Sequence, residues 1–206
     1  TISKNSVLIN GEGQGADLPF HGQITQFYNG GDFTYFVGDA SKAYEAPMKT
    51  FKRAMLFLRP NVYVVYDELA ASKKSTFSWL LNTFAKPDID EANQKMVVAQ
   101  QKERLEVQQV FPKELKYTTT NKRPYPMKTR AWTRFSEAFP QGWHTEVTTP
   151  AVDKDSILTL MQTYKESDGA NVKTQDQYKT DSTMGLKIAD GANRDGVILF
   201  RRELDK

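Results

Sequence analysis

The sequence predicts an all-β protein: an antiparallel β-sandwich of layered sheets in a single domain, residues 1–206. Polar and apolar side chains alternate in many short runs, which is the pattern of half-buried strands. Turn signals such as NGGD, KPDID and DGANRDG recur too often to leave room for helices of ordinary length. The chain has 206 residues, 39% of them hydrophobic, and no visible repeat or linker, which suits one large core.

The strongest element is a hairpin in FKRAMLFLRPNVYVVYDEL, residues 51–69. Two runs rich in β-formers flank RPN, whose proline suits a turn and cannot sit in a central ladder. The same reasoning gives the other strands. In chain order, the expected strands are Ser6–Asn10, Gln23–Tyr28, Phe33–Val37, Phe51–Leu58, Val62–Leu69, Thr76–Phe84, Lys95–Ala99, Arg104–Val110, Trp143–Thr148, Ser156–Tyr164, Met184–Ile188 and Val197–Arg201.

Two segments also permit a helical turn. Residues 39–49, DASKAYEAPMK, are interrupted by Pro47, and residues 131–139, AWTRFSEAF, are short and aromatic. This many short strands with irregular loops favour a sandwich over a closed barrel, although sequence separates these two architectures poorly.

Composition excludes several classes of function. Cysteine is absent, which excludes a disulfide framework, a thiolate metal site and a cysteine nucleophile. No run approaches the roughly 18 apolar residues that span a bilayer, so we expect no membrane partner. The net charge of +3 is too small to indicate nucleic acid. Residues 113–134 nevertheless hold seven basic residues and one acidic residue, Glu114.

Several stretches resemble one family. KNSVLINGEGQ (4–14) resembles the histidine-asparagine-serine/threonine strand of heparinase II/III-type polysaccharide lyases. FTYFVGDASKAY (33–44), followed by residues 51–71, resembles the next part of the same C-terminal β-sandwich. FSWLLNTFAKPDI (77–89) and GWHTEVTTP (142–150) are similar to later strands. The patterns occur in the family's order, densely over residues 4–89 and thinly afterwards.

The resemblance implies a longer parent protein with an α-helical toroid upstream of the sandwich and an active site between the two parts. It implies cleavage of acidic, uronate-containing polysaccharide by β-elimination. That reaction needs a neutralised carboxylate, removal of the adjacent proton and protonation of the departing oxygen. The family's His and Tyr for these steps lie mainly on the toroid and first strands, so we expect no catalytic residue here. The abrupt opening TISKNSVLING also suggests a fragment.

The family's sandwich can hold zinc, with one ligand at the histidine before the asparagine. Lys4 stands at that position, and an ammonium group does not ligate zinc as neutral imidazole does. We therefore expect no metal and no cofactor.

Other residues with possible chemistry have plainer interpretations. His21 and His144 have no metal-ligand neighbour at short spacing and are expected to be surface or hydrogen-bonded structural residues, His144 facing opposite to its strand neighbours. Asp39 and Asp67 follow apolar strands and are expected to cap turns. GEGQG (11–15) lacks the lysine and helix of a phosphate loop and is interpreted as a turn.

The basic segment is the candidate glycan-binding site. It interleaves cations with aromatic rings, and two prolines there favour a loop. Guanidinium groups suit carboxylates and sulfates, and aromatic faces can stack on sugar rings. The candidate residues are Lys122, Arg123, Arg130, Trp132 and Arg134. The alternatives are that these charges only keep a loop solvated, or that they bind nucleic acid, which we disfavour because no nucleic-acid fold is recognised.

The leading hypothesis is therefore the C-terminal sandwich of a bacterial, periplasmic or extracellular polysaccharide lyase. Such a domain would buttress the toroid, line the glycan cleft and lack activity alone. The alternatives are a non-catalytic carbohydrate-binding module and a purely structural sandwich. The polysaccharide and the oligomeric state stay open.

Overall fold

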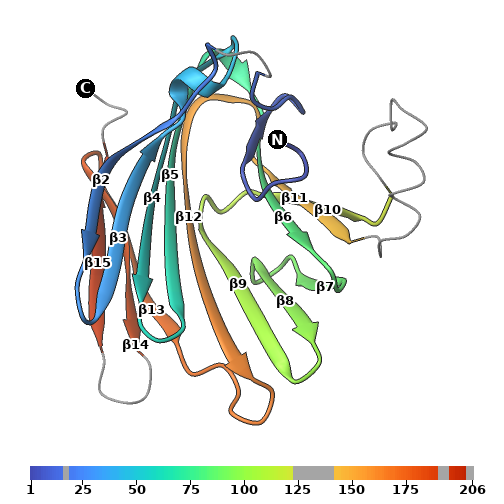
Figure 1. Ribbon diagram of the computed structural model, residues 1–206, viewed down its shortest axis with the longest axis vertical. Helices are drawn as coiled ribbons and strands as arrows, with labels where there is room; N and C mark the ends of the chain where they lie inside the picture. The colour runs from blue at the N-terminus through green and yellow to red at the C-terminus, as the bar shows by residue number, and fades with distance from the viewer. Residues whose placement is uncertain (16–18, 123–141, 190–194, 203–206) are drawn as a thin grey trace.

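The computed structural model describes residues 1–15, 19–122, 142–189 and 195–202, and its secondary structure is almost entirely antiparallel strand (Figure 1). Among these residues the only helical element is a single 3-10 turn, η1 (Ser41–Ala43). None of the helical structure in this part of the chain is long and apolar enough to cross a membrane.

The central sheet has eight strands in the order β2-β3-β4-β5-β12-β9-β8-β7. Figure 1 shows it spreading from β2 on the left to β7 on the right. Its strands are β2 (Gln23–Asn29), β3 (Phe33–Asp39), β4 (Met48–Leu58), β5 (Val62–Ser75), β7 (Pro87–Asp90), β8 (Lys95–Gln100), β9 (Glu103–Phe111) and β12 (Val152–Lys165).

Two smaller sheets cover parts of its two faces. The first outer sheet, in the order β1-β6-β11-β10, is made of β1 (Val7–Ile9), β6 (Phe77–Thr83), β11 (Trp143–Thr148) and β10 (Lys116–Thr120). The second outer sheet, in the order β13-β14-β15, is made of β13 (Lys173–Lys179), β14 (Thr183–Ala189) and β15 (Gly196–Arg201). The predicted layered antiparallel sandwich is confirmed.

Each pair of layers encloses its own hydrophobic core. Between the central and first outer sheets, Leu69 and Ile157 pack in one cluster with Trp79. Between the central and second outer sheets, Leu158 packs in another with Met184. Each fully buried side chain of this size contributes about 1.5–3 kcal/mol of hydrophobic stabilisation. The long middle strands β5 and β12 are therefore buried on both faces.

The predicted strands all occur, but the structure adds three that the sequence did not indicate: β7, β10 and β13. The hairpin at residues 51–69 is confirmed, with Leu58 paired to Val62 across the turn. Of the two possible helical segments, residues 39–49 contain only η1, and residues 131–139 lie outside the described part of the chain.

The expectation for Asp67 is wrong. β5 continues to Ser75, so Asp67 lies in mid-strand with its side chain fully buried rather than at a turn. Asp39 behaves as expected, because its Oδ1 accepts a hydrogen bond from the Ser41 N–H at 2.9 Å in the turn after β3.

Candidate functional site

The first outer sheet covers only part of the central sheet, and the remainder of that face is the candidate site. Phe27 lies opposite Phe36, and Phe36 lies opposite Met55. Directly opposed residues share a face of a sheet, and alternation places these on the same face as the core residue Phe51. Phe27 is 69% exposed and Phe36 and Met55 are partly exposed. We call this surface the open face.

Aromatic side chains continue along the open face. Phe57 and Tyr63 are stacked, with ring centroids 4.5 Å apart and planes 11° from parallel. The Arg59 guanidinium lies 5.5 Å from the centre of the Phe57 ring and donates hydrogen bonds to Asn29 and Thr34. The surface therefore combines flat apolar rings with fixed polar groups.

A cavity of about 320 Å³ lies at the end of the open face beside the N-terminal segment. Apolar and polar side chains share its wall. They are Ser6, Gln14, Gln23, Ile24, Phe36, Asp39, Phe51 and Arg53, together with Gly22, Gly38 and Ala40. We call this cavity the N-terminal pocket. Its hydrogen-bonding side chains, two of them charged, lie beside the aromatic rings of Phe36 and Phe51, and polar groups beside apolar rings are typical of ligand pockets.

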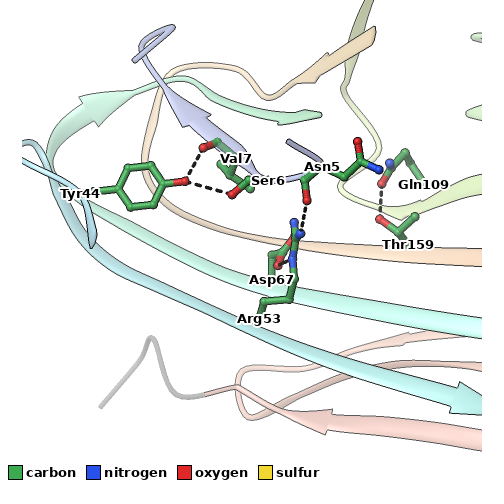
Figure 2. Close-up of polar contacts among 8 residues, drawn as sticks. All are labelled: Asn5, Ser6, Val7, Tyr44, Arg53, Asp67, Gln109 and Thr159. Atoms are coloured by element: carbon green, nitrogen blue, oxygen red, sulfur yellow. Dashed lines mark hydrogen bonds and ion pairs between the residues drawn. The ribbon is translucent and has the colours of Figure 1, made fainter. Parts of the chain in front are cut away.

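A bidentate ion pair supports one wall of this pocket (Figure 2). Arg53 donates from Nε to Asp67 Oδ1 at 2.6 Å and from Nη2 to Oδ2 at 2.8 Å. Its Nη1 donates to the Asn5 carbonyl at 2.8 Å. Burial works to lower the pKa of Arg53, but the charge and hydrogen bonds of Asp67 outweigh it and raise the pKa above its usual value. Arg53 is therefore a permanent cation held by its partners.

Two further polar contacts lie nearby in Figure 2. The Tyr44 hydroxyl donates to the Val7 carbonyl at 2.6 Å and lies 3.3 Å from Ser6 Oγ. Burial raises the pKa of Tyr44, so the hydroxyl stays protonated and acts as a donor. The Thr159 hydroxyl donates to Gln109 Oε1 at 2.7 Å, and both side chains are buried. These contacts hold the N-terminal strand and the floor of the sheet in place.

Asp39 at the pocket wall is a carboxylate at neutral pH. Burial works to raise its pKa, but hydrogen bonds from Ser41 and the charges of Lys52 and Lys42 outweigh burial and hold the pKa below its usual value. Since its hydrogen bonds stabilise the turn, a proton-transfer role is not indicated.

The expected role of His144 agrees with its surroundings. Its Nδ1 lies 2.9 Å from Asn82 Oδ1, and its Nε2 lies 3.1 Å from Glu146 Oε1. Asn82 donates from its backbone N–H to Asn5 Oδ1 at 2.8 Å and from Nδ2 at 3.3 Å. His144 is 6% exposed and faces away from the first core, so it is a hydrogen-bonded residue of the framework. His21 is exposed and contacts the Pro19 carbonyl.

The described residues do not form a zinc site of the kind that the resemblance implies. Lys4 occupies the position at which the resemblance places a histidine, and it is exposed. Among the described residues, no group of three or more His, Cys, Asp or Glu side chains is arranged to hold a metal ion.

The predicted glycan-binding residues are only partly placed. Lys122 is exposed just beyond the end of β10, where its N–H donates to Thr120 Oγ1 at 3.0 Å. Arg123, Arg130, Trp132 and Arg134 lie outside the described residues. The N-terminal pocket was not anticipated, because its wall joins residues 6, 14, 23 and 53, which share no motif.

These features define a layered β-sandwich with an open face beside its N-terminal strand. No protein-family model and no curated protein matches the chain in sequence. Solved structures do match in fold. The heparan sulfate lyase HepC of Pedobacter heparinus superposes with a TM-score of 0.73 at 8% identity, over 97% of this chain and 30% of that one. A structure of heparinase III superposes with a TM-score of 0.68 at 10% identity, over 96% of this chain and 29% of that one.

The chain thus has the fold of the heparinase C-terminal β-sandwich and spans about 30% of the length of these lyases. The resemblance expected from KNSVLING and the later stretches is confirmed at the level of fold.

Proposed function

We propose that the chain is the sandwich portion of a polysaccharide lyase that acts by β-elimination on uronate-containing acidic polysaccharide. The observation that carries this proposal is the fold match over 97% of the chain to HepC, of which it covers 30%. In the longer protein the sandwich supports an upstream α-helical toroid and lines the glycan cleft. By the same analogy the protein is periplasmic or extracellular.

The open face supports the toroid-docking part of the proposal. Ile24 and Phe27 on β2 are 68% and 69% exposed, and the partly exposed rings of Phe36, Phe57 and Tyr63 adjoin them. A contiguous apolar surface of this kind on a soluble domain marks an interaction site. The expected occupant is the rest of the lyase, and the N-terminal pocket would then lie at the edge of the contact.

The described residues also favour a supporting role over independent catalysis. The hydroxyl of Tyr44 is committed to Val7, and His144 is buried among hydrogen-bonding partners. Neither side chain lines the N-terminal pocket. We therefore propose that the proton-transfer groups come from the toroid.

Chromatography on immobilised heparan sulfate tests glycan contact. We expect the isolated chain to be retained, and replacement of Arg130, Trp132 and Arg134 by alanine to shorten its retention. The matched control removes two cations and one aromatic ring from β13, through alanine at Lys173, Tyr178 and Lys179, which are exposed. The control should be retained like wild type. Equal retention of both variants, or no retention of any chain, favours a purely structural sandwich.

A lyase assay tests the division of labour. We expect the 206-residue chain to release no unsaturated uronide, detected by ultraviolet absorbance, from heparan sulfate or alginate. Release by this chain alone would contradict the assignment of catalysis to the toroid.

A further inference from the structure

A cavity larger than the N-terminal pocket lies on the other side of the central sheet. Its volume is about 670 Å³. The floor of the cavity is formed by the start of β3, the end of β4 and the start of β5. The floor residues are Phe33, Tyr35, Leu56, Leu58 and Val62, and the rest of the apolar wall comes from Val172, Ile188 and Phe200. Packed layers of a sandwich leave few voids larger than a water molecule. A space this large between the layers is therefore a position that the described side chains leave unfilled.

The cavity follows one edge of β15. Every residue from Asp195 to Arg201 lines it, although side chains alternate between the two faces of a strand. Ile198 and Phe200 face the second core, whereas Val197 and Leu199 are 55% and 56% exposed. A cavity lined by both the inward-facing and the outward-facing residues of β15 lies beside the edge of the strand rather than over one of its faces.

That edge of β15 has no partner in the described part of the chain. β15 pairs with β14 from Gly196 to Arg201 and is the last strand of the second outer sheet. An edge strand presents a row of N–H and C=O groups that can pair with another chain. Adjacent strands lie about 4.8 Å apart and stacked sheets about 10 Å apart, so one more strand beside β15 would lie over the floor of the cavity.

We propose that this groove binds an extended peptide segment of a partner polypeptide, which adds to β15 as a further strand. Backbone pairing would supply affinity, and apolar side chains at alternate positions would fill the floor at Leu56 and Leu58. Those floor residues are partly exposed now, as expected of an unfilled position. A free acyl chain fits less well because it would leave the backbone groups of β15 unpaired.

Two carboxylates at one end of the groove indicate which charge the bound peptide should carry there. Asp32 and Asp195 are exposed on the groove, and no hydrogen bond or ion pair of either side-chain carboxylate is seen among the described residues, although the Asp32 backbone carbonyl accepts from the Arg59 N–H at 3.0 Å. The nearby Arg59 guanidinium is held by the Gly30 carbonyl, Asn29 and Thr34. Figure 1 shows β15 starting at the end of the sandwich where β2 turns into β3. We expect a basic residue of the peptide at this end.

The probe is a pool of octapeptides with Val, Ile, Leu or Phe at alternate positions, Thr between them and a terminal Lys. One control pool has the same composition with the apolar residues contiguous. A second is N-methylated at alternate amides, which blocks pairing. We expect the first pool to bind at least tenfold more tightly than either control in fluorescence anisotropy, and to slow amide exchange in β15. Exchange in β2, an edge strand of the central sheet, is the internal control and should not change.

Three protein variants test the site more directly. Leu56→Ser should weaken binding about tenfold, whereas Phe27→Ser, on the open face, should not. Asp32→Asn with Asp195→Asn should reduce the preference for a terminal Lys over a terminal Glu at least threefold. Absence of binding by the pool, equal binding of the N-methylated pool, or equal slowing at β2 overturns the proposal. Protection of β15 by self-association without peptide also overturns it, since the occupant is then a second copy. None of these outcomes depends on lyase activity.

Discussion

Removing the Asp67 carboxylate should be among the most destabilising single changes in the central sheet. The Asp67 side chain is fully buried and that of Arg53 is 18% exposed, and two short hydrogen bonds join them. Asp67→Ala leaves a guanidinium without its counter-charge, and an arginine side chain stays protonated in proteins, so it cannot become neutral instead. Breaking a buried pair in this way costs about 3–5 kcal/mol. We expect about 3 kcal/mol, since Arg53 retains some solvent contact.

Urea unfolding followed by circular dichroism measures this loss. The double variant Arg53→Met/Asp67→Leu removes both charges and should recover most of the stability, because apolar replacement of a whole buried pair is often nearly neutral. The control is Lys95→Ala, which breaks a more exposed pair with Glu106 at 3.5 Å and should cost less than about 1 kcal/mol. A loss below about 1 kcal/mol for Asp67→Ala, with the double variant equal to the sum of the singles, would refute the reasoning.

Two further predictions concern buried polar groups. Tyr44→Phe should lower the free energy of unfolding by about 1–2 kcal/mol, because the Val7 carbonyl loses its donor. Tyr117→Phe should leave stability unchanged or raise it, since the buried Tyr117 hydroxyl has no partner in the described structure. Urea unfolding of both variants tests this contrast, and an equal loss of stability in Tyr44→Phe and Tyr117→Phe would contradict it. Burial raises the pKa of Asp155, against the opposing effects of the Ser156 N–H, Lys179 and Arg202. The native state therefore binds that proton more tightly than the unfolded state, and stability falls as pH rises from about 3.8 through the raised pKa. Asp155→Asn should gain stability relative to wild type between about pH 3 and pH 7, and a constant difference across that range would argue against it.

The alternation of polar and apolar side chains predicted most of the strands, because the strands of the sandwich bury side chains on defined faces. The three strands that were not predicted lack this alternation or are very short. β13, KTQDQYK, has no buried side chain, and β7 is four residues long and begins at Pro87. β10 lay inside the basic segment, whose charges and prolines favoured a loop. Asp67 was misjudged because a single carboxylate in an apolar run ordinarily marks a strand end, and its partner Arg53 is 14 residues away.

The candidate site was less predictable than the fold because it is assembled from segments distant in sequence. The wall of the N-terminal pocket draws on the N-terminal segment, β2, β3 and β4. No short sequence motif predicts that these segments come together. Their exposure at the pocket depends on how far the first outer sheet extends over the central sheet. The basic segment carried a strong compositional signal, but its role still rests on that composition and on the fold match.

The stretch KNSVLING owes its structural importance to Asn5. Its carbonyl accepts from Arg53 of the central sheet, and its Oδ1 accepts from Asn82 of the first outer sheet, which also contacts His144. One asparagine therefore links the ion pair beside the N-terminal pocket to the outer layer, and the asparagine amide supplies an acceptor that aliphatic side chains lack. Lys4 is exposed beside it, and none of these bonds involves its side chain. The framework role of this strand is thus separable from whatever the preceding residue binds, which explains how the sandwich can keep its fold with lysine at that position.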